Sequence, residues 1–351
     1  MKDHKSVIVG LSGGVDSTIA AVLLQQAGFD VRGVTLHLWH VAPEKTTSIA
    51  ERARAITDEL GIPLQVLNIR ERFYDEVVLP FADTYARGET PNPCVVCNPS
   101  LKFDALLTEA DRVGATWIAT GHYARVTHPS EGPAQLLRAR SRQRDQSYML
   151  HRLNQRILTR LRLPLGELED KAAVRELAHQ LDLPSADVHD SQDLCFLAGG
   201  DYRAFLREMR PQSFEPGPIV DENGNVLGQH LGLPRYTVGQ RSGLGLAKKG
   251  KLYVLALRPA DNALVVGPAE RLQKSDCRLR DVTFTRDGPP APRFHAEVRI
   301  RYRAPLVSAE IELLSNASAH VTFSQPQRAP APGQSVVFYR GDVVLGGGII
   351  H

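Results

Sequence analysis

Two kinds of hydrophobic pattern alternate along the first 200 residues of the chain. Short runs rich in β-branched residues predict buried strands at 6–9, 31–36, 64–69 and 117–120. Between and after them, apolar residues spaced three or four apart predict helices at 18–24, 46–60, 72–86, 101–113 and 172–181. Strands that alternate with helices of about 10–15 residues indicate a doubly wound parallel sheet in an α/β fold.

The pattern changes in the rest of the chain. A short helix is predicted at 202–209, and Pro- and Gly-rich turns then separate short alternating strands such as 252–257 and 295–302. The proline-rich segment 286–293 predicts a loop. We therefore expect three domains, namely an α/β catalytic domain at 1–200, a small β-rich linking domain at 201–272 and a C-terminal β-barrel-like domain at 273–351.

The composition is that of an ordinary globular protein. The chain has 351 residues, 42% of them hydrophobic and 23% charged, which is enough for two or three domains with buried cores. Its formal net charge is only +3, so a nucleic acid would have to be held by local basic patches. The first residues contain no signal-peptide core, and no apolar run approaches about 18 residues. We expect a cytoplasmic protein with no membrane partner.

The first predicted strand is joined to the first helix by a glycine-rich stretch, Gly10-Leu11-Ser12-Gly13-Gly14-Val15-Asp16-Ser17. Gly13 and Gly14 let backbone N–H groups approach a ligand, and we expect Asp16 or Ser17 to cap the helix. A glycine turn before a helix N-terminus favours a phosphate group. The stretch lacks both the Lys-Ser or Lys-Thr of a Walker A loop and the pattern G-x-G-x-x-G.

The order Ser-Gly-Gly-x-Asp-Ser resembles the PP-loop of ATP pyrophosphatases, which cleave ATP to AMP and pyrophosphate while they adenylate an oxygen. The match favours ATP binding over a plain turn. Ligands of parallel sheets lie at the carboxyl ends of the strands. Leu36 and Gly121-His122 also follow predicted strands, so we expect them at the same edge.

The four cysteines are too few for a disulfide scaffold. Cys94 and Cys97 form a C-x-x-C in a Pro-rich loop, a spacing found in half zinc sites, redox pairs, iron–sulfur ligand sets and nucleophiles. A zinc site would need His122 and Cys195, because no second C-x-x-C or H-x-x-x-H is present. Only the fold can bring Cys195 to this loop. Cys277 has no motif around it and is interpreted as a structural or surface thiol.

An activated oxygen together with two separated thiols indicates a sulfur-transfer reaction. One cysteine would carry a persulfide whose terminal sulfur attacks the adenylated carbon, and the second would attack the inner sulfur and release the product. Both steps need thiolates, so we expect cationic groups nearby.

Seven motifs in one order resemble the tRNA-specific 2-thiouridylase (MnmA/TrmU) family over the whole chain. They are Gly10-Leu-Ser-Gly-Gly-Val-Asp-Ser17, Thr90-Pro-Asn-Pro-Cys-Val-Val-Cys-Asn98, Ala119-Thr-Gly-His-Tyr-Ala-Arg125, Asp145-Gln-Ser-Tyr148, Asp190-Ser-Gln-Asp-Leu-Cys-Phe196, Tyr236-Thr-Val-Gly-Gln-Arg-Ser-Gly-Leu244 and Leu345-Gly-Gly-Gly-Ile349.

The resemblance implies a tRNA-uridine 2-sulfurtransferase. ATP would adenylate the C2 oxygen of the wobble uridine, position 34, in tRNAs for Lys, Glu and Gln, and AMP and pyrophosphate would be released. Cys195 would carry the persulfide, Cys97 would resolve it, and Asp16 would lie near the ATP phosphates and Mg²⁺. Sulfur would come from a cysteine desulfurase or a sulfur-relay protein.

The resemblance also implies two binding sets. ATP would be bound by Gly10, Leu11, Ser12, Gly13, Gly14, Val15, Asp16, Ser17, Leu36 and Gly121. The tRNA would be contacted by His122, Asp145, Gln146, Ser147, Arg301, Tyr302 and Gln334.

Basic and aromatic residues near these positions allow two interpretations. Arg138, Arg140, Arg142 and Arg144 alternate, as do Arg299, Arg301 and Arg303, so each set could lie on one strand face and meet phosphates or form a solvated face. Tyr148 and Tyr302 could stack on bases or belong to the core.

Departures from the family pattern leave alternatives open. Pro99-Ser100 and Val188 stand where family members typically carry basic residues, so the means of thiolate activation is open. Cys94, Cys97 and Cys195 could instead hold a [4Fe-4S] cluster whose fourth iron binds sulfide. A PP-loop amide ligase with incidental cysteines, or a non-catalytic RNA-binding protein, are further alternatives.

Overall fold

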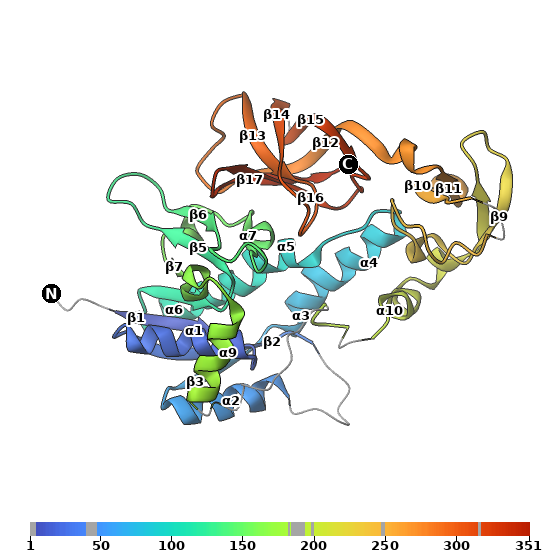
Figure 1. The fold of residues 1–351 in the computed structure, drawn as a ribbon. Helices are drawn as coiled ribbons and strands as arrows, with labels where there is room; N and C mark the ends of the chain where they lie inside the picture. The colour runs from blue at the N-terminus through green and yellow to red at the C-terminus, as the bar shows by residue number, and fades with distance from the viewer. Residues whose placement is uncertain are drawn as a thin grey trace.

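The computed structural model describes residues 5–39, 48–181, 183, 194–197, 200–246, 250–314 and 317–351. Three β-sheets of five, four and eight strands organise these residues. Figure 1 shows the five-stranded sheet and its helices below the C-terminal barrel, with the four-stranded module to one side. The prediction of an α/β domain followed by a small β-rich module and a barrel is confirmed.

The first sheet is parallel, with the strand order β3-β2-β1-β4-β7. Its strands are β1 (Ser6–Gly10), β2 (Asp30–His37), β3 (Leu64–Asn68), β4 (Trp117–Thr120) and β7 (Leu161–Arg162). The four predicted strands are confirmed to within a few residues. β7 escapes prediction because two residues are too short to show a period.

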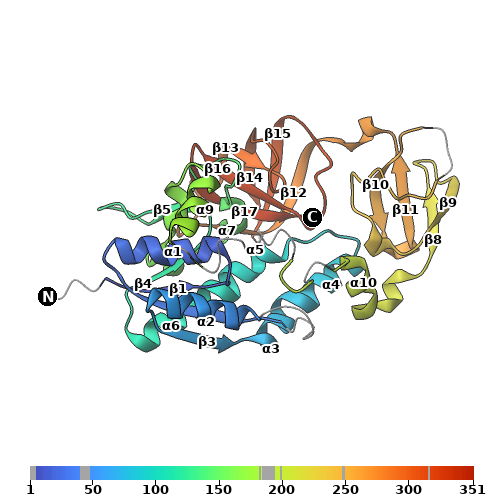
Figure 2. The same ribbon diagram turned by 60° about the horizontal axis from the view of Figure 1, so that its bottom comes forward.

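Helices cover both faces of this sheet, because successive strand residues point to opposite sides. Ile8 packs on the core that α6 buries, whereas Val9 packs on the core of α1 and α2. Figure 2 shows helices on both sides of the strands, with α9 near α1. These helices are α1 (Val15–Gln26), α2 (Ile49–Leu60), α6 (Phe103–Val113) and α9 (Lys171–Gln180).

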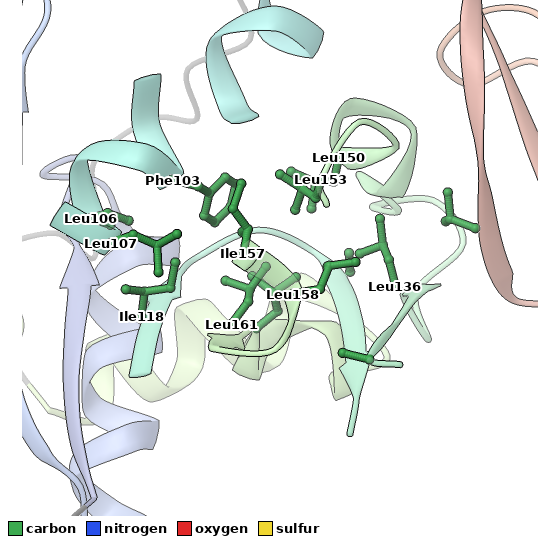
Figure 3. Close-up of a cluster of buried hydrophobic side chains, with 14 of the residues drawn as sticks. Phe103, Leu106, Leu107, Ile118, Leu136, Leu150, Leu153, Ile157, Leu158 and Leu161 are labelled. Atoms are coloured by element: carbon green, nitrogen blue, oxygen red, sulfur yellow. The ribbon is translucent and has the colours of Figure 1, made fainter. Parts of the chain in front are cut away.

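The core beneath α6 joins the sheet to the chain that follows it. Its fully or almost fully buried side chains include Phe103, Leu106, Leu107, Ile118, Leu136, Ile157, Leu158 and Leu161 (Figure 3). Burying one such side chain contributes about 1.5–3 kcal/mol. This core therefore fixes the start of α6, which follows the segment that contains Cys94 and Cys97.

Two π turns, one followed by a proline and one that contains a proline, interrupt the helical segments of the first domain. The expected helix at 72–86 is divided into α3 (Arg70–Phe73), a π turn (Tyr74–Val78) and α4 (Leu79–Ala86), with Pro80 at the start of α4. A second π turn (Asn98–Lys102) contains Pro99 and joins α5 (Pro93–Cys97) to α6. Proline has no N–H for an i→i−4 bond, so each π turn re-registers the helix around it.

The remaining short helical elements of the first domain follow the parallel sheet along the chain and lead to the other two domains. They are α7 (Ser147–Leu150), α8 (Gln155–Leu158) and the 3₁₀ helix Pro164–Glu167. The predicted helix at 202–209 is confirmed as α10 (Tyr202–Met209).

The central module has the strand order β10-β11-β8-β9. Its strands are β8 (Gly217–Val220), β9 (Val226–His230), β10 (Tyr253–Arg258) and β11 (Ala263–Gly267). The 3₁₀ helices of this part are Pro211–Phe214, Leu233–Arg235, Pro259–Asp261 and Ala269–Leu272. Ile219, Val254 and Leu264 are fully buried in its own core.

The C-terminal domain is an antiparallel barrel that closes through pairing of β12 with β17. Its strands are β12 (Gln273–Phe284), β13 (Arg293–Arg299), β14 (Val307–Leu314), β15 (Ser318–Arg328), β16 (Ser335–Arg340) and β17 (Val343–Ile350). The proline-rich segment 286–293 is a loop up to Pro292, as predicted. The predicted strand at 295–302 ends at Arg299, so Arg301 and Tyr302 lie in a turn.

A hairpin from the first domain extends the barrel sheet. β5 (Ala124–Thr127) and β6 (Gln135–Arg138) pair with each other, and Leu137 of β6 pairs with Val343 of β17. The eight-stranded sheet thus crosses the boundary between the α/β and barrel portions of the chain. Within the described parts of the chain, no helix has the length and apolar character needed to cross a membrane.

Candidate functional site

The glycine-rich loop lies at the carboxyl end of β1, between β2 and β4. Leu11 N donates to Val34 O at 2.8 Å, and the Thr35 hydroxyl donates to Leu11 O at 2.8 Å, so β2 holds the start of the loop. Gly13 has φ +76°, a conformation that favours glycine. These contacts and the glycine conformation define the course of the loop between β1 and α1.

The N-cap of α1 is Gly14, and no side chain caps the helix, so the expectation that Asp16 or Ser17 does so is wrong. The Ser17 hydroxyl instead donates to Gly14 O at 2.9 Å and accepts from Ser12 N at 3.1 Å. Ser17 thereby closes the loop on itself. The uncapped N-terminus of α1 suits an anionic ligand.

Leu36 and Gly121 lie at the same sheet edge as the loop, as the sequence predicts. Leu36 is near the end of β2, and Gly121 directly follows β4. A Cβ on Gly121 would lie 2.6 Å from the carbonyl carbon of Asp16, so the two backbones are in contact. Arg52 of α2 lies against Gly13 and brings a cation to the loop that the sequence analysis did not single out.

Asp16 is the acidic residue in the first turn of α1, and both of its carboxylate oxygens accept hydrogen bonds. Tyr123 Oη donates to Oδ1 at 2.8 Å, and Lys171 Nζ donates to Oδ2 at 3.0 Å. About a third of the Asp16 side chain is exposed, whereas Lys171 is 7% exposed. Neither partner can be predicted from the residues around Asp16, because both lie more than 100 residues away along the chain.

The cysteine segment is a short helix with its own capping residue. Asn92 accepts a hydrogen bond from Cys94 N at 3.2 Å and also contacts Met149 Sδ. Asn98 Nδ2 donates to Met149 O at 3.0 Å. These contacts fix α5 against α7, with Cys97 buried and Cys94 half-buried.

The fold brings the neighbours of Cys195, namely Leu194, Phe196 and Leu197, to the same apolar cluster as Cys97, although 98 residues separate the two cysteines in the sequence. Phe196 packs edge-on against Phe73 and Phe81, with ring centroids 5.9 Å and 5.2 Å apart. Cys195 itself is exposed. All four cysteines are free thiols, and the motif residues Asp190 to Asp193, together with Val188, lie outside the described residues.

Lys102 supplies a positive charge that interacts with Cys94, Cys97 and Cys195. Burial raises the pKa of Cys97 to about 12, and Lys102 opposes this shift. Although the surface of Cys195 is exposed, the protein atoms packed around its thiol raise the pKa of Cys195, and Lys102 acts in the opposite direction. Burial lowers the pKa of Lys102, but the three thiols together raise it above its ordinary value. Lys102 therefore supplies positive charge that neither Pro99 nor Ser100 can. The sequence signal was a lysine between two apolar residues, Leu101 and Phe103.

The described residues do not converge into a metal site. No three or more Cys, His, Asp or Glu side chains among them are arranged to hold a metal ion, which includes the set Cys94, Cys97, Cys195 and His122. His122 instead contacts the Thr120 hydroxyl through Nδ1 at 2.8 Å. Burial, assisted by Lys102, lowers the pKa of His122 to about 3, so its ring is neutral. Cys277 is half-buried in β12.

The segment Asp145-Gln146-Ser147 lies between the α/β domain and the barrel. Asp145 is buried and accepts from Arg299 Nη1 at 3.2 Å. Ser147 is fully buried, whereas Gln146 is half-buried. Gln146 is therefore the most solvent-accessible of these three residues.

The barrel residues predicted to contact tRNA lie close to this segment and to the cysteine loop. Tyr302 packs on Tyr148 with ring centroids 6.1 Å apart, and Arg301 beside it is exposed. Gln334 Nε2 donates to Thr90 O at 2.7 Å, four residues before Cys94. Gln334 thus lies next to the cysteine loop, and Tyr302 lies next to the segment Asp145-Gln146-Ser147.

The proposed arginine faces are wrong, because neither series lies on one strand. β6 ends at Arg138 and β13 ends at Arg299. Arg140 pairs with Glu167, and Arg142 pairs with Asp342. Tyr148 is fully buried and its hydroxyl donates to Ser335 O at 2.9 Å, so it belongs to the core.

Comparison with known proteins covers the whole chain. Residues 5–199 match the model described as the tRNA methyl transferase HUP domain, 203–268 its PRC-barrel domain and 274–350 the aminomethyltransferase beta-barrel domain. Proteins from Carboxydothermus hydrogenoformans, Chloroflexus aggregans and Magnetococcus marinus are 45%, 47% and 44% identical to it. The alignments cover 98–100% of this chain and 98–100% of each relative, and each relative is named tRNA-specific 2-thiouridylase MnmA.

The chain belongs to the tRNA-specific 2-thiouridylase family. The family membership predicted from the seven sequence motifs is confirmed. The HUP domain of this family implies the use of ATP. Among solved structures, the U34-tRNA thiolase NcsA from Methanococcus maripaludis with its [4Fe-4S] cluster is 16% identical, with a TM-score of 0.36. That alignment covers 59% of this chain and 64% of the other, and so low a likeness carries no conclusion about the cofactors of this chain.

Proposed function

We propose that this tRNA 2-thiouridylase thiolates the wobble uridine, position 34, of tRNAs for Lys, Glu and Gln, with ATP as the activating substrate. The observation that carries the proposal is the placement of Cys97 and the Cys195 segment on one apolar cluster beside Lys102, in the domain that holds the glycine-rich loop. Family membership adds that the relatives are tRNA-specific.

In the activation step, the glycine-rich loop and the N-terminus of α1 bind the ATP phosphates. The C2 oxygen of the uridine attacks the α-phosphorus of ATP, and pyrophosphate leaves. The Asp16 carboxylate lies at this loop and is partly exposed, which fits a Mg²⁺ ligand. A bound Mg²⁺ would neutralise charge on the phosphate oxygens.

In the transfer step, Cys195 carries an extra sulfur as a persulfide. Its terminal sulfur attacks C2 and AMP leaves with the former C2 oxygen. The Cys97 thiolate then attacks the Cys195 sulfur, a Cys97–Cys195 disulfide forms, and the electron pair of the broken S–S bond stays on the sulfur bound to C2. An external thiol reductant restores both cysteines, and a cysteine desulfurase or sulfur-relay protein reloads Cys195.

The exposure of Cys195 suits loading by a protein donor, and the burial of Cys97 suits a residue that acts only later. The alternative is a [4Fe-4S] cluster held by Cys94, Cys97 and Cys195, although the described residues include no group of three potential ligands arranged for a metal ion.

The test is 2-thiouridine formation on unmodified glutamate tRNA by anaerobic protein, with ATP and either sulfide or a persulfide donor. The protein is assayed both without and with a reconstituted iron–sulfur cluster. We expect cluster-free protein to be active with the persulfide donor, and Cys97→Ser and Cys195→Ser to abolish that activity. Cys277→Ser is the matched control and should keep it.

Each contrary result has a distinct meaning. Activity only with the cluster would refute the persulfide route and reassign Cys94, Cys97 and Cys195 as ligands. Absence of thiolation in every condition would refute the proposed function. ATP cleavage that tolerates both serine variants and ignores tRNA would point to an amide ligase.

A further inference from the structure

Two side chains from distant parts of the chain determine how the Asp16 carboxylate is oriented. Tyr123 Oη holds Oδ1 at 2.8 Å and Lys171 Nζ holds Oδ2 at 3.0 Å. Hydrogen bonds to a charged group are stronger than those between neutral groups. Turning the carboxylate away from this position therefore requires that both donors be given up.

Tyr123 is in turn joined to the segment predicted to contact tRNA. Tyr123 N donates to Gln146 Oε1 at 2.8 Å, and Gln146 N donates to Tyr123 O at 2.7 Å. Gln146 thus holds the backbone of Tyr123 from both its side chain and its main chain. An RNA group that hydrogen-bonds to the Gln146 side chain would compete with the bond from Tyr123 N. Tyr123 is itself hydrogen-bonded to Asp16, so the RNA would be linked to Asp16 through these two hydrogen bonds.

The neighbours of Gln146 are fixed to the barrel. Asp145 accepts from Arg299 of β13 at 3.2 Å, and Tyr148 donates to Ser335 at the start of β16 at 2.9 Å. Both residues are buried. Gln146 is the half-buried residue between two anchored ones, so its side chain is the part of this segment that a ligand can reach.

Contact between the backbones transmits a displacement of Tyr123 to the glycine-rich loop. A Cβ on Gly121 would lie within 2.7 Å of Asp16 O and Ser17 N, so the segment before Tyr123 has no free space above the loop. Because the backbone before Tyr123 is already in contact with the loop, a shift of Tyr123 changes the position of its hydroxyl relative to the Asp16 carboxylate.

We propose that Tyr123 is a positioning residue that couples RNA binding at Gln146 to the orientation of Asp16 in the ATP site. The proposal rests on the proposed function and adds a linkage between its two substrates. Linkage is reciprocal, so bound nucleotide must raise tRNA affinity by the same factor as tRNA raises nucleotide affinity.

The experiment measures tRNA dissociation constants by fluorescence anisotropy, with and without saturating Mg²⁺ and a non-hydrolysable ATP analogue. We expect the wild type to bind tRNA about tenfold more tightly with the analogue. Tyr123→Phe should bring this ratio close to one, while its Kd without nucleotide stays within about twofold of wild type. Gln146→Met removes the hydrogen bond between the Gln146 side chain and Tyr123 N. Its ratio should also fall close to one, and it should bind tRNA more weakly than the wild type.

Two further variants serve as comparisons. Tyr236→Phe changes a buried tyrosine of the central module and should keep the wild-type ratio. Lys171→Met removes the other donor to Asp16 and should weaken analogue binding while keeping at least half of the ratio. Thermal unfolding of each variant reports whether it is folded.

A preserved ratio in Tyr123→Phe, or a wild-type ratio of one, would overturn the proposal. So would equal loss in Tyr123→Phe and Lys171→Met, because any damage to Asp16 would then have the same effect. Thiolation is assayed on the same wild-type preparation. If it fails while the ratio behaves as expected, the proposed function is refuted and the coupling is supported.

Discussion

Asp145 of the α/β domain and Arg299 of the barrel form a buried ion pair, with Asp145 Oδ2 3.2 Å from Arg299 Nη1. Their side chains are 0% and 8% exposed, and Arg138 approaches the same carboxylate at 3.5 Å. Both guanidinium groups also lie over the ring of Tyr339. The pair therefore joins the two domains where Gln146 meets Tyr123.

We expect Asp145→Asn to lower the free energy of unfolding by about 3–5 kcal/mol, because it leaves the buried Arg299 and the half-buried Arg138 without their counter-charge. Urea denaturation followed by fluorescence measures the change. The matched control is Glu167→Gln, which breaks the ion pair with Arg140 in which both side chains are more than half exposed. That change should cost less than about 1 kcal/mol. Equal effects of the two substitutions would contradict a structural role for the buried pair.

Lys102→Met should slow every reaction that needs a Cys97 thiolate. The pKa of Cys97 is already raised to about 12 by burial, and removing the opposing lysine raises it further. Below that pKa the thiolate fraction rises about tenfold for each pH unit. Peptide mass spectrometry after iodoacetamide treatment at pH 7 to 9 reports Cys97 alkylation separately from the other cysteines.

We expect the alkylation rate to rise with pH in both proteins and to be lower in Lys102→Met at every pH. Lys102→Arg keeps the charge and should restore part of the rate. A rate that does not respond to Lys102→Met would show that the lysine does not activate Cys97.

Acid should destabilise the protein through His151. Burial lowers the pKa of His151 to about 4, whereas an unfolded histidine titrates near about 6.5. Below about pH 6.5 the unfolded state binds the proton more readily, so stability falls as pH drops toward 4. This group contributes a loss of about 2 kcal/mol between pH 7 and 5.

In His151→Asn, the loss of unfolding free energy between pH 7 and pH 5 should be smaller by that amount. The control His295→Gln changes a histidine whose side chain is 83% exposed and should leave the free energy of unfolding at pH 7 within about 0.5 kcal/mol of that of the wild type. An unchanged pH dependence in His151→Asn would disprove the assignment.

Gly121→Ala should weaken ATP binding at least about tenfold, because the new methyl group would press on the backbone of Asp16 at 2.6 Å and displace the glycine-rich loop. Isothermal titration with a non-hydrolysable ATP analogue measures this. Gly288→Ala adds the same methyl group where nothing lies within 4 Å, and its analogue affinity should match that of the wild type. Full affinity in Gly121→Ala would mean that the loop can move to accommodate the side chain.

Local patterns were sufficient for the strands and helices of the parallel sheet and for the glycine-rich loop. β1 and β2 are short apolar runs, and the loop is contiguous in the chain, so each pattern is contained in a few neighbouring residues. The prediction failed where a proline altered helical register, as at Pro80, and where a strand had almost no length, as in β7. It also failed at Arg299, where β13 ends, so that Arg299, Arg301 and Arg303 do not share one strand face.

The family, the reaction class and the identity of Cys97, Cys195 and Asp16 as candidates could be inferred from residue order alone, because motifs are contiguous. Which groups surround those candidates could not. Lys171 and Tyr123 reach Asp16 from 155 and 107 residues away, and Arg299 reaches Asp145 across 154 residues. Charge, burial and hydrogen bonding act over a few ångströms in space, and only the packing of the sheet, the hairpin and the barrel decides which residues come that close.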